Sequence, residues 1–201
     1  MAELDRWETR FSPPGYVFGK EPNAFLKAQA HRLRPGQLAL SVADGEGRNG
    51  VWLAEQGLDV LSIDFSPVAL AKARALAQER GVALRTEVAD VTAWRWPETA
   101  YDVIVAIFTQ VVFPAERTSF FANLKRALKP GGLLLMQGYR VEQLAYRTGG
   151  PPEPERLYTR ALLEEAFGDM TELEIREHDS AISEGTGHVG MSALIDLVAK
   201  K

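Results

Sequence analysis

The stretch that decides the fold is LALSVADGEGRNG, residues 38–50. Its apolar beginning predicts a buried strand, and Gly45, Gly47 and Gly50 form a glycine-rich turn that opens into a helix. A second apolar run, residues 60–63, ends in Asp64, nineteen residues after Gly45. A carboxylate about 20 residues after such a turn is typical of proteins that hold a ribose. The pattern therefore predicts an α/β protein with an adenosine-containing cofactor.

Strands and helices alternate on both sides of this stretch. Apolar strands are predicted at about 37–43, 59–63, 82–88, 101–108 and 133–137, and helices at about 48–56, 67–80 and 115–128. A helix at about 159–167 then precedes strands at about 171–178 and 189–198, which a short glycine-rich connection joins as an antiparallel hairpin. Short strands separated by helices predict a mostly parallel, doubly wound seven-stranded sheet with helices on both faces.

Length and composition predict one domain over residues 1–201, because 201 residues with 46% hydrophobic content provide one good core. The net charge of -4 argues against a nucleic-acid partner. The absence of cysteine excludes disulfides, thiolate metal sites and a cysteine nucleophile. No group of Asp, Glu and His has metal-ligand spacing, so we expect no metal. A charged N-terminus and the lack of an apolar run of ~18 residues predict a cytoplasmic protein without a membrane span.

The order of the motifs resembles the class I S-adenosylmethionine-dependent methyltransferases. The motifs that follow that order are the glycine turn, Asp64, Ala89-Asp90, residues 101–104 and residues 128–132. Shorter motifs, residues 16–23 and Glu184-Gly185 with His188, look like the branch of tellurite-resistance and thiopurine methyltransferases. The resemblance implies a Rossmann-like sheet, S-adenosylmethionine as cofactor and S-adenosylhomocysteine as product. It also implies a small-molecule methyl acceptor, such as a thiol or a chalcogen compound.

The first strand departs from the family pattern. Ser41 stands where an acidic residue is usual, and Ala43 replaces the first glycine of the loop. Asp44 occupies a loop position that is commonly small or uncharged. Asp44 is therefore our candidate for the carboxylate that meets the amino group of the methionine part, and the alternative is a purely structural turn residue.

In open α/β sheets the ligand lies at the carboxyl ends of the strands, and the resemblance gives those positions their roles. Asp64 would accept hydrogen bonds from the ribose, and Asp90, with the backbone of Val91, would bind the adenine. The cofactor-binding residues that we predict are Asp44, Gly45, Gly47, Asp64, Phe65, Asp90, Val91 and Ile107. On the acceptor side we predict Phe108, Gln110, Tyr139 and Arg140, with His188 as the candidate catalytic residue.

Methyl transfer requires that the nucleophile, the methyl group and the leaving sulfur are aligned and that water is excluded. It has no obligatory acid or base. An acceptor that attacks as a thiolate or as a reduced chalcogen species needs almost no base. An oxygen or nitrogen nucleophile would need a base, and His188 is then the first candidate. The sequence leaves these alternatives open.

The N-terminal residues 1–35 precede the alternating pattern. Residues 1–20 are rich in aromatic residues, glycine and proline, which predicts an ordered arm, and residues 22–33 predict a helix. The aromatic side chains of the arm have two interpretations. They form either a lid whose π faces favour the positive sulfonium, or a core that anchors a helix. These side chains are Trp7, Phe11, Tyr16 and Phe18.

Two other functions fit parts of the sequence. The glycine turn with Asp64 also meets the fingerprint of an NAD-dependent oxidoreductase. Against it, the Tyr-x-x-x-Lys pair of such enzymes occurs here only as Tyr16 and Lys20, ahead of the cofactor turn. Ser41 and Ala43 leave open a catalytically silent S-adenosylmethionine-binding module.

Overall fold

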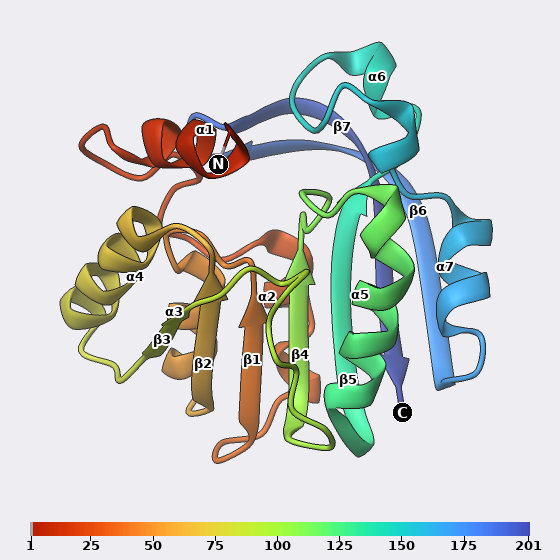
Figure 1. Cartoon of the computed structure of the whole chain (residues 1–201), viewed down its shortest axis with the longest axis horizontal. Coiled ribbons are helices and arrows are strands. Elements are labelled where there is room, and N and C mark those ends of the chain that lie inside the picture. The colour runs from red at the N-terminus through yellow and green to blue at the C-terminus, as the bar shows by residue number, and fades with distance from the viewer. Residues whose placement is uncertain (1) are drawn as a thin grey trace.

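The computed structural model describes residues 2–201 and has one seven-stranded sheet (Figure 1). The strands are β1 (Leu38–Val42), β2 (Asp59–Asp64), β3 (Arg85–Val88), β4 (Tyr101–Ile107), β5 (Leu128–Tyr139), β6 (Thr171–Glu184) and β7 (His188–Lys200). Their order across the sheet is β3-β2-β1-β4-β5-β7-β6. Strands β1 to β5 pair in parallel, and β7 is antiparallel to both β5 and β6. The predicted fold class, including the C-terminal hairpin, is confirmed.

The strand order reverses at β1. The chain adds β2 and β3 on one side of β1, and then returns to add β4 and β5 on the other side. Connections that leave neighbouring strands in opposite directions open a crevice outside the carboxyl ends of those strands. The glycine turn follows β1 directly, so it lies at this crevice.

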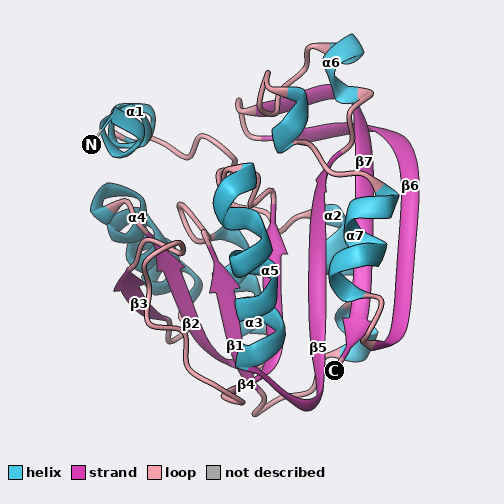
Figure 2. Ribbon diagram, turned by 45° about the vertical axis from the view of Figure 1, so that its right-hand side comes forward, coloured by secondary structure: helices cyan, strands magenta, loops and turns pink. Residues whose placement is uncertain are grey.

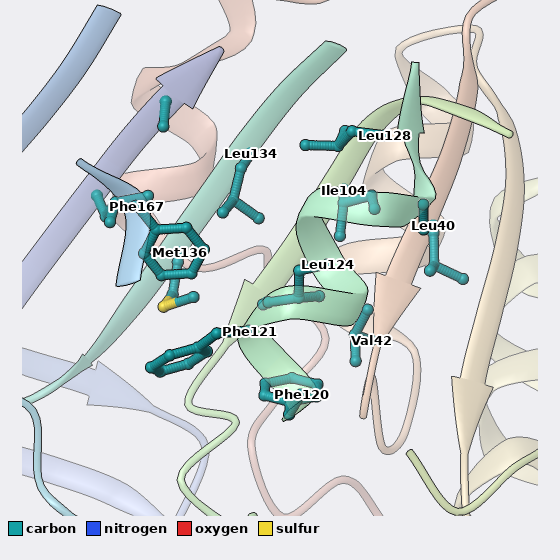
Figure 3. Close-up of a cluster of buried hydrophobic side chains, with 14 of the residues drawn as sticks. Leu40, Val42, Ile104, Phe120, Phe121, Leu124, Leu128, Leu134, Met136 and Phe167 are labelled. Atoms are coloured by element: carbon teal, nitrogen blue, oxygen red, sulfur yellow. The ribbon is translucent and has the colours of Figure 1, made fainter. Parts of the chain in front are cut away.

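Helices cover both faces of the sheet, because side chains of β1 alternate between the faces. Leu40 and Val42 belong to a cluster with side chains of α5 (Pro114–Ala127) and α7 (Arg160–Phe167), as Figure 3 shows. Ala39 instead packs with side chains of α2 (Ala24–Ala28) and α3 (Arg48–Glu55). Figure 2 shows α5 and α7 on the same face. The remaining long helix, α4 (Pro67–Arg80), packs on β2, β3 and α3.

The largest departure from the sequence prediction is α1 (Ala2–Phe11), a helix in the segment where the sequence predicts an ordered arm. The predicted helix over residues 22–33 is split into α2, which Asn23 caps, and a 3-10 turn, Ala30–Arg32. The predicted loop 140–156 contains α6 (Gln143–Tyr146) and a 3-10 turn, Pro154–Arg156.

The two strands of the hairpin are longer than predicted. In Figure 1 they extend past the carboxyl ends of the parallel strands and curve toward α1. Elements from the two ends of the chain therefore meet above the crevice. Among the helices of residues 2–201, none combines the length and the apolar character needed to cross a membrane.

Candidate functional site

A first cavity of about 280 Å³ lies at the crevice. The glycine turn, the ends of β2 and β4 and the segment after β3 form its walls, together with side chains of α1 and His188. Seven of the predicted cofactor residues line it: Asp44, Gly45, Asp64, Phe65, Asp90, Val91 and Ile107. The structure thus brings together residues that lie up to 63 positions apart in the sequence (107 − 44).

Gly47, by contrast, is not among the residues that line this cavity. Its φ is +88°, and a Cβ atom there would lie 2.5 Å from the Cβ of Ala73 on α4. The physical requirement for glycine at this position is therefore the close packing of the turn on α4.

Asp64 is 4% exposed and holds the glycine turn and the start of α4 in place. Its Oδ2 accepts a hydrogen bond from the backbone N–H of Gly45, and its Oδ1 accepts one from that of Ser66, both at 2.9 Å. A carboxylate has about four lone-pair positions, so each oxygen keeps one for a further donor. Burial raises the pKa of Asp64 to about 6 in spite of these backbone donors. Asp64 thus has the hydrogen-bonding capacity that a ribose diol requires.

Asp44 links the turn to two other elements. Its Oδ2 accepts a hydrogen bond from the Ser62 hydroxyl of β2 at 2.8 Å and from the backbone N–H of Gly50 in α3 at 3.1 Å. Burial raises the pKa of Asp44 to about 6, against the hydroxyl and backbone donors. These contacts give Asp44 a structural role, and its predicted contact with the methionine amino group stays a prediction.

Asp90 also lines the first cavity and is exposed. Its Oδ1 accepts hydrogen bonds from the backbone N–H and the hydroxyl of Thr92, at 2.9 and 2.7 Å. Val91, the next residue, is 7% exposed and contributes apolar wall beside Asp90, whereas Ile107, also 7% exposed, lines the cavity from the end of β4. Asp90 and Val91 together combine a carboxylate with an apolar surface, which suits the edge and the face of a purine.

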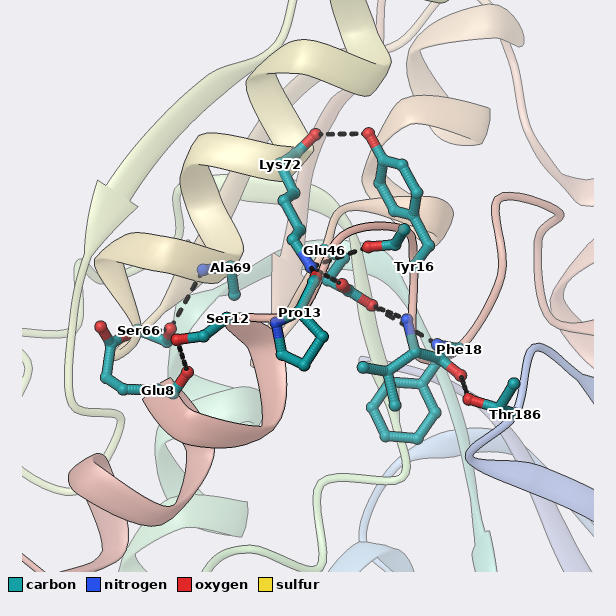
Figure 4. Close-up of polar contacts among 12 residues, drawn as sticks. Glu8, Ser12, Pro13, Tyr16, Phe18, Glu46, Ser66, Ala69, Lys72 and Thr186 are labelled. Carbon is teal, nitrogen blue, oxygen red and sulfur yellow. Dashed lines mark hydrogen bonds and ion pairs between the residues drawn. The ribbon is translucent and has the colours of Figure 1, made fainter.

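Helix α1 covers the first cavity. Trp7, Phe11 and Phe18 line it, and the rings of Trp7 and Phe11 stack at 5.4 Å between centroids. The Glu8 carboxylate accepts hydrogen bonds from the Ser66 hydroxyl and, at 3.3 Å, from the backbone N–H of Val68, so it fixes α1 to the start of α4 (Figure 4). Three of the four predicted aromatic residues therefore lie at the cavity.

The strap, which we define as residues 12–19, connects α1 to the rest of the chain and is held by a buried ion pair that the sequence did not predict (Figure 4). The Glu46 carboxylate accepts a hydrogen bond from the backbone N–H of Val17 at 2.7 Å and pairs with Lys72 at 2.9 Å. Lys72 also donates to two strap carbonyls, and the Tyr16 hydroxyl donates to the Lys72 carbonyl. Tyr16 therefore anchors the strap and does not line either cavity described here.

The C-terminal hairpin holds the other side of the strap. The carbonyl of Val17 accepts hydrogen bonds from the backbone N–H groups of Thr186 and Gly187, at 2.8 and 2.9 Å. These contacts bring the hairpin turn to the first cavity, which explains why His188 lines it.

His188 forms a buried pair with Glu184, which faces it across the hairpin turn. The Nδ1 atom of His188 lies 3.2 Å from Glu184 Oε2, and the same carboxylate accepts hydrogen bonds from Arg48 at 2.8 Å and Asn23 at 2.9 Å. Despite burial, these donors lower the pKa of Glu184 to about 2. Burial lowers the pKa of His188, although Glu184 opposes this effect. The pair is therefore an ionised carboxylate beside a neutral imidazole at neutral pH.

A second cavity, of about 160 Å³, adjoins the first. The two share five lining residues: Trp7, Phe18, Phe108, Val111 and His188. Phe108, with φ at +54°, packs its ring against Tyr139 and His188, with centroids at 4.6 and 4.5 Å. Of the other predicted acceptor-side residues, Gln110 and Tyr139 line the second cavity. Arg140 does not, because its guanidinium is bound to Asp179 and to the Leu194 carbonyl.

Residues 39–132 match a protein-family model described as a methyltransferase domain. The chain is 33% identical to glycine/sarcosine N-methyltransferase of Halorhodospira halochloris over 141 residues, 67% of this chain and 48% of that protein. Its fold is similar to that of TehB from Haemophilus influenzae, with a TM-score of 0.71, 18% identity and coverage of 99% and 67% of the two chains. Phosphoethanolamine N-methyltransferase 2 of Haemonchus contortus, in complex with S-adenosyl-L-methionine, has a TM-score of 0.72, 18% identity and coverage of 96% and 57%.

The chain spans about half the length of the glycine/sarcosine N-methyltransferase. At 18% identity, the likenesses to solved structures concern the fold. The match over residues 39–132 covers the glycine turn, Asp64 and Asp90, the motifs on which the prediction of the cofactor depended. Residues 39–132 are therefore similar to methyltransferase domains, the fold is of the class I methyltransferase type, and the cofactor is S-adenosylmethionine.

Proposed function

We propose that the protein transfers a methyl group from S-adenosylmethionine to a small-molecule acceptor that occupies the second cavity. The observation that carries this proposal is the wall shared by the two cavities, which includes His188. A cofactor in the first cavity and an acceptor in the second would meet at that wall, as an in-line displacement requires. The aromatic side chains around it exclude water from the reacting atoms.

The charges of the first cavity are consistent with the cofactor. Its lining includes the carboxylates of Asp44, Asp64 and Asp90, and S-adenosylmethionine carries a positive sulfonium and a positive amino group. When bound, this cofactor supplies a methyl group on a positively charged sulfur and leaves as S-adenosylhomocysteine. In the proposal, Asp64 binds the ribose through its two remaining lone pairs, and Asp90 and Val91 bind the adenine.

Glu184 and His188 are the groups that we assign to the acceptor's proton. An ionised carboxylate only accepts hydrogen bonds, so the Nδ1 atom of His188 must carry the proton of the neutral ring. The Nε2 atom then keeps a lone pair, which takes the proton that the nucleophile loses. Glu184 positions the ring and stabilises the imidazolium that forms, and Arg48 and Asn23 hold Glu184.

The nucleophilic atom of the acceptor determines how much the reaction depends on His188. A thiol or chalcogen acceptor, as in tellurite- and thiopurine-like detoxification, ionises without much help and makes little demand on His188. The names of the glycine/sarcosine and phosphoethanolamine relatives state N-methylation, and an ammonium group must lose a proton before it attacks. The buried Glu184–His188 pair is a specific observation in favour of an acceptor that needs a base.

The experiment that tests the proposal measures methyl transfer to matched thiol, selenol and amine acceptors by wild type and His188→Ala. His31→Ala is the control, because His31 is exposed and lines neither cavity. With an amine acceptor, His188→Ala should lower kcat by about 10²- to 10⁴-fold. With a thiol acceptor, at a pH above the pKa of the thiol, the kcat of His188→Ala should stay close to that of wild type. Binding of S-adenosylmethionine without turnover on any acceptor would instead favour a catalytically silent module.

A further inference from the structure

The two cavities differ in the charge of their walls. The first cavity is lined by five carboxylates, Glu3, Asp44, Asp64, Asp90 and Glu116, and by one guanidinium, Arg48. The second is lined by three guanidinium groups, Arg6, Arg10 and Arg156, and no carboxylate is among its lining residues. Clefts with one sign of charge concentrate ligands of the opposite sign. The first cavity thus suits a cation, and the second suits an anion.

The three arginines are neutralised to different degrees. Arg6 pairs with Glu3 at 2.7 Å, and Arg156 has a longer pair, 3.5 Å, with the partly exposed Glu153. Within residues 2–201, Arg10 has no carboxylate at ion-pair distance. Its guanidinium lies over the rings of Trp7 and Phe18, at 5.3 and 5.1 Å from their centroids. Arg10 therefore supplies the uncompensated positive charge of this cavity.

Arg156 is the most rigidly placed of the three, at 4% exposure. Its Nε donates to the carbonyl of Gln110 at 3.0 Å, and its guanidinium carbon lies 4.4 Å from the centroid of the Phe113 ring. The Gln110 side chain in turn donates to the Tyr139 carbonyl at 2.9 Å. A planar guanidinium held in this way presents its remaining N–H groups in a fixed direction, which suits a carboxylate.

Apolar side chains contribute about half of the lining of the second cavity. They include Phe18, Phe108, Val111, Pro151 and Pro152. An inorganic oxyanion needs hydrogen-bond donors on most of its sides, because a buried charge without partners is costly. Apolar walls with cationic groups among them instead favour a carbon skeleton with one anionic end.

We propose that the methyl acceptor is a small organic acid. Its carboxylate binds Arg10 and Arg156, its carbon skeleton lies on Phe108, and its nucleophilic atom faces the first cavity beside His188. This inference rests on the proposed function, since it identifies the class of molecule that the methyl group reaches. It makes Arg10, on the helix that covers the cofactor, a specificity-determining residue for the acceptor.

The test compares small mercapto and amino acids, such as 3-mercaptopropionate and 3-aminopropionate, with the amides in which an uncharged group replaces the carboxylate. Calorimetry of protein saturated with S-adenosylhomocysteine should give at least tenfold tighter binding of each acid than of its amide. The kcat/KM for methylation should follow the same order. Arg10→Gln should reduce the preference for the acid to within about threefold. Arg85→Gln is the matched control, because Arg85 is exposed, pairs with Asp59 and lines neither cavity.

Equal affinity for acid and amide, in a protein that binds the cofactor and methylates either of them, would overturn this inference and leave the proposed function intact. Tighter binding of selenite than of both acids would also overturn it, because the carbon skeleton would then be superfluous. Failure to bind S-adenosylhomocysteine would contradict the proposed function and the inference with it.

Discussion

Asp64→Asn tests the assignment of the cofactor ribose to the end of β2. Each oxygen of Asp64 accepts one backbone N–H at 2.9 Å and keeps one free lone pair. An amide has only one such oxygen and no charge, so the variant loses at least one charge-assisted hydrogen bond to the ribose. Such a bond contributes about 1.5–3 kcal/mol, which is about a tenfold to hundredfold loss of affinity for S-adenosylhomocysteine.

The same substitution should leave the protein folded. A pKa raised from 3.8 to about 6 means that burying the ionised carboxylate costs about 3 kcal/mol above pH 6. The amide avoids this cost but deprives one backbone N–H of its acceptor, at about 1–3 kcal/mol. These two effects nearly cancel, so the free energy of unfolding at pH 7.5 should change by less than about 2 kcal/mol.

Calorimetric titration with S-adenosylhomocysteine at pH 7.5 measures the affinity of both forms. Asp59→Asn is the matched control, because Asp59 is the exposed first residue of the strand that Asp64 ends. The control should bind with wild-type affinity. If folded Asp64→Asn also binds within twofold of wild type, the ribose does not depend on Asp64 and the assignment is wrong.

Three further predictions concern the elements around the site. Glu46→Gln removes the charge that pairs with Lys72, so we expect a loss of about 2 kcal/mol in unfolding free energy and faster proteolysis within the strap, residues 12–19. Unchanged proteolysis would contradict the role of Glu46 in holding the strap. The folded-state pKa of Asp44 is raised, so its contribution to stability is complete below about pH 4 and is lost as pH rises through 6. Urea unfolding should therefore show wild type losing about 3 kcal/mol relative to Asp44→Asn over this range, and parallel pH profiles would refute it. Gly47→Ala should cost more than about 3 kcal/mol, measured by thermal unfolding, because its Cβ would meet Ala73. Gly81→Ala, also at positive φ but with open space around it, should cost about 1 kcal/mol, and equal costs would exclude the clash.

The parallel part of the sheet was predictable because its signals are local. The apolar runs before Gly45 and Asp64 correspond to β1 and β2. Helix α4 begins as predicted, with Ser66 as its capping residue and Pro67 in its first turn. These elements are decided by burial and by backbone hydrogen bonds within a few residues. The bounds of β1, β2 and α4 in the structure differ from the predicted ones by one residue or less.

Helix α1 was not predicted, since what stabilises it lies elsewhere in the chain. Its apolar side chains pack against the glycine turn and the strap, and the partner of Glu8 is Ser66, 58 residues away. A helix of ten residues, seven of them charged or aromatic, is too short to be stable on its own. Tertiary contacts supply what local propensity lacks.

The Glu184–His188 pair has a signal in the sequence. Two residues that flank a three-residue turn in a hairpin face each other, so an acid and a histidine at these positions predict a pair. What the sequence did not reveal is that Arg48, from α3, and Asn23, before α2, converge on the same carboxylate. Convergence of three other segments on one side chain depends on the packing of the whole molecule.

The hydrogen bonds between Val17 and the turn at Thr186 join residues 169 positions apart. Closing so large a loop is entropically expensive, and contacts of high sequence separation form slowly during folding. We therefore expect the parallel sheet to form first, and the contacts between the strap and the C-terminal hairpin to form last. In a refolding time course, far-ultraviolet circular dichroism should recover before the capacity to bind S-adenosylhomocysteine. The ligand would then report the final step of folding.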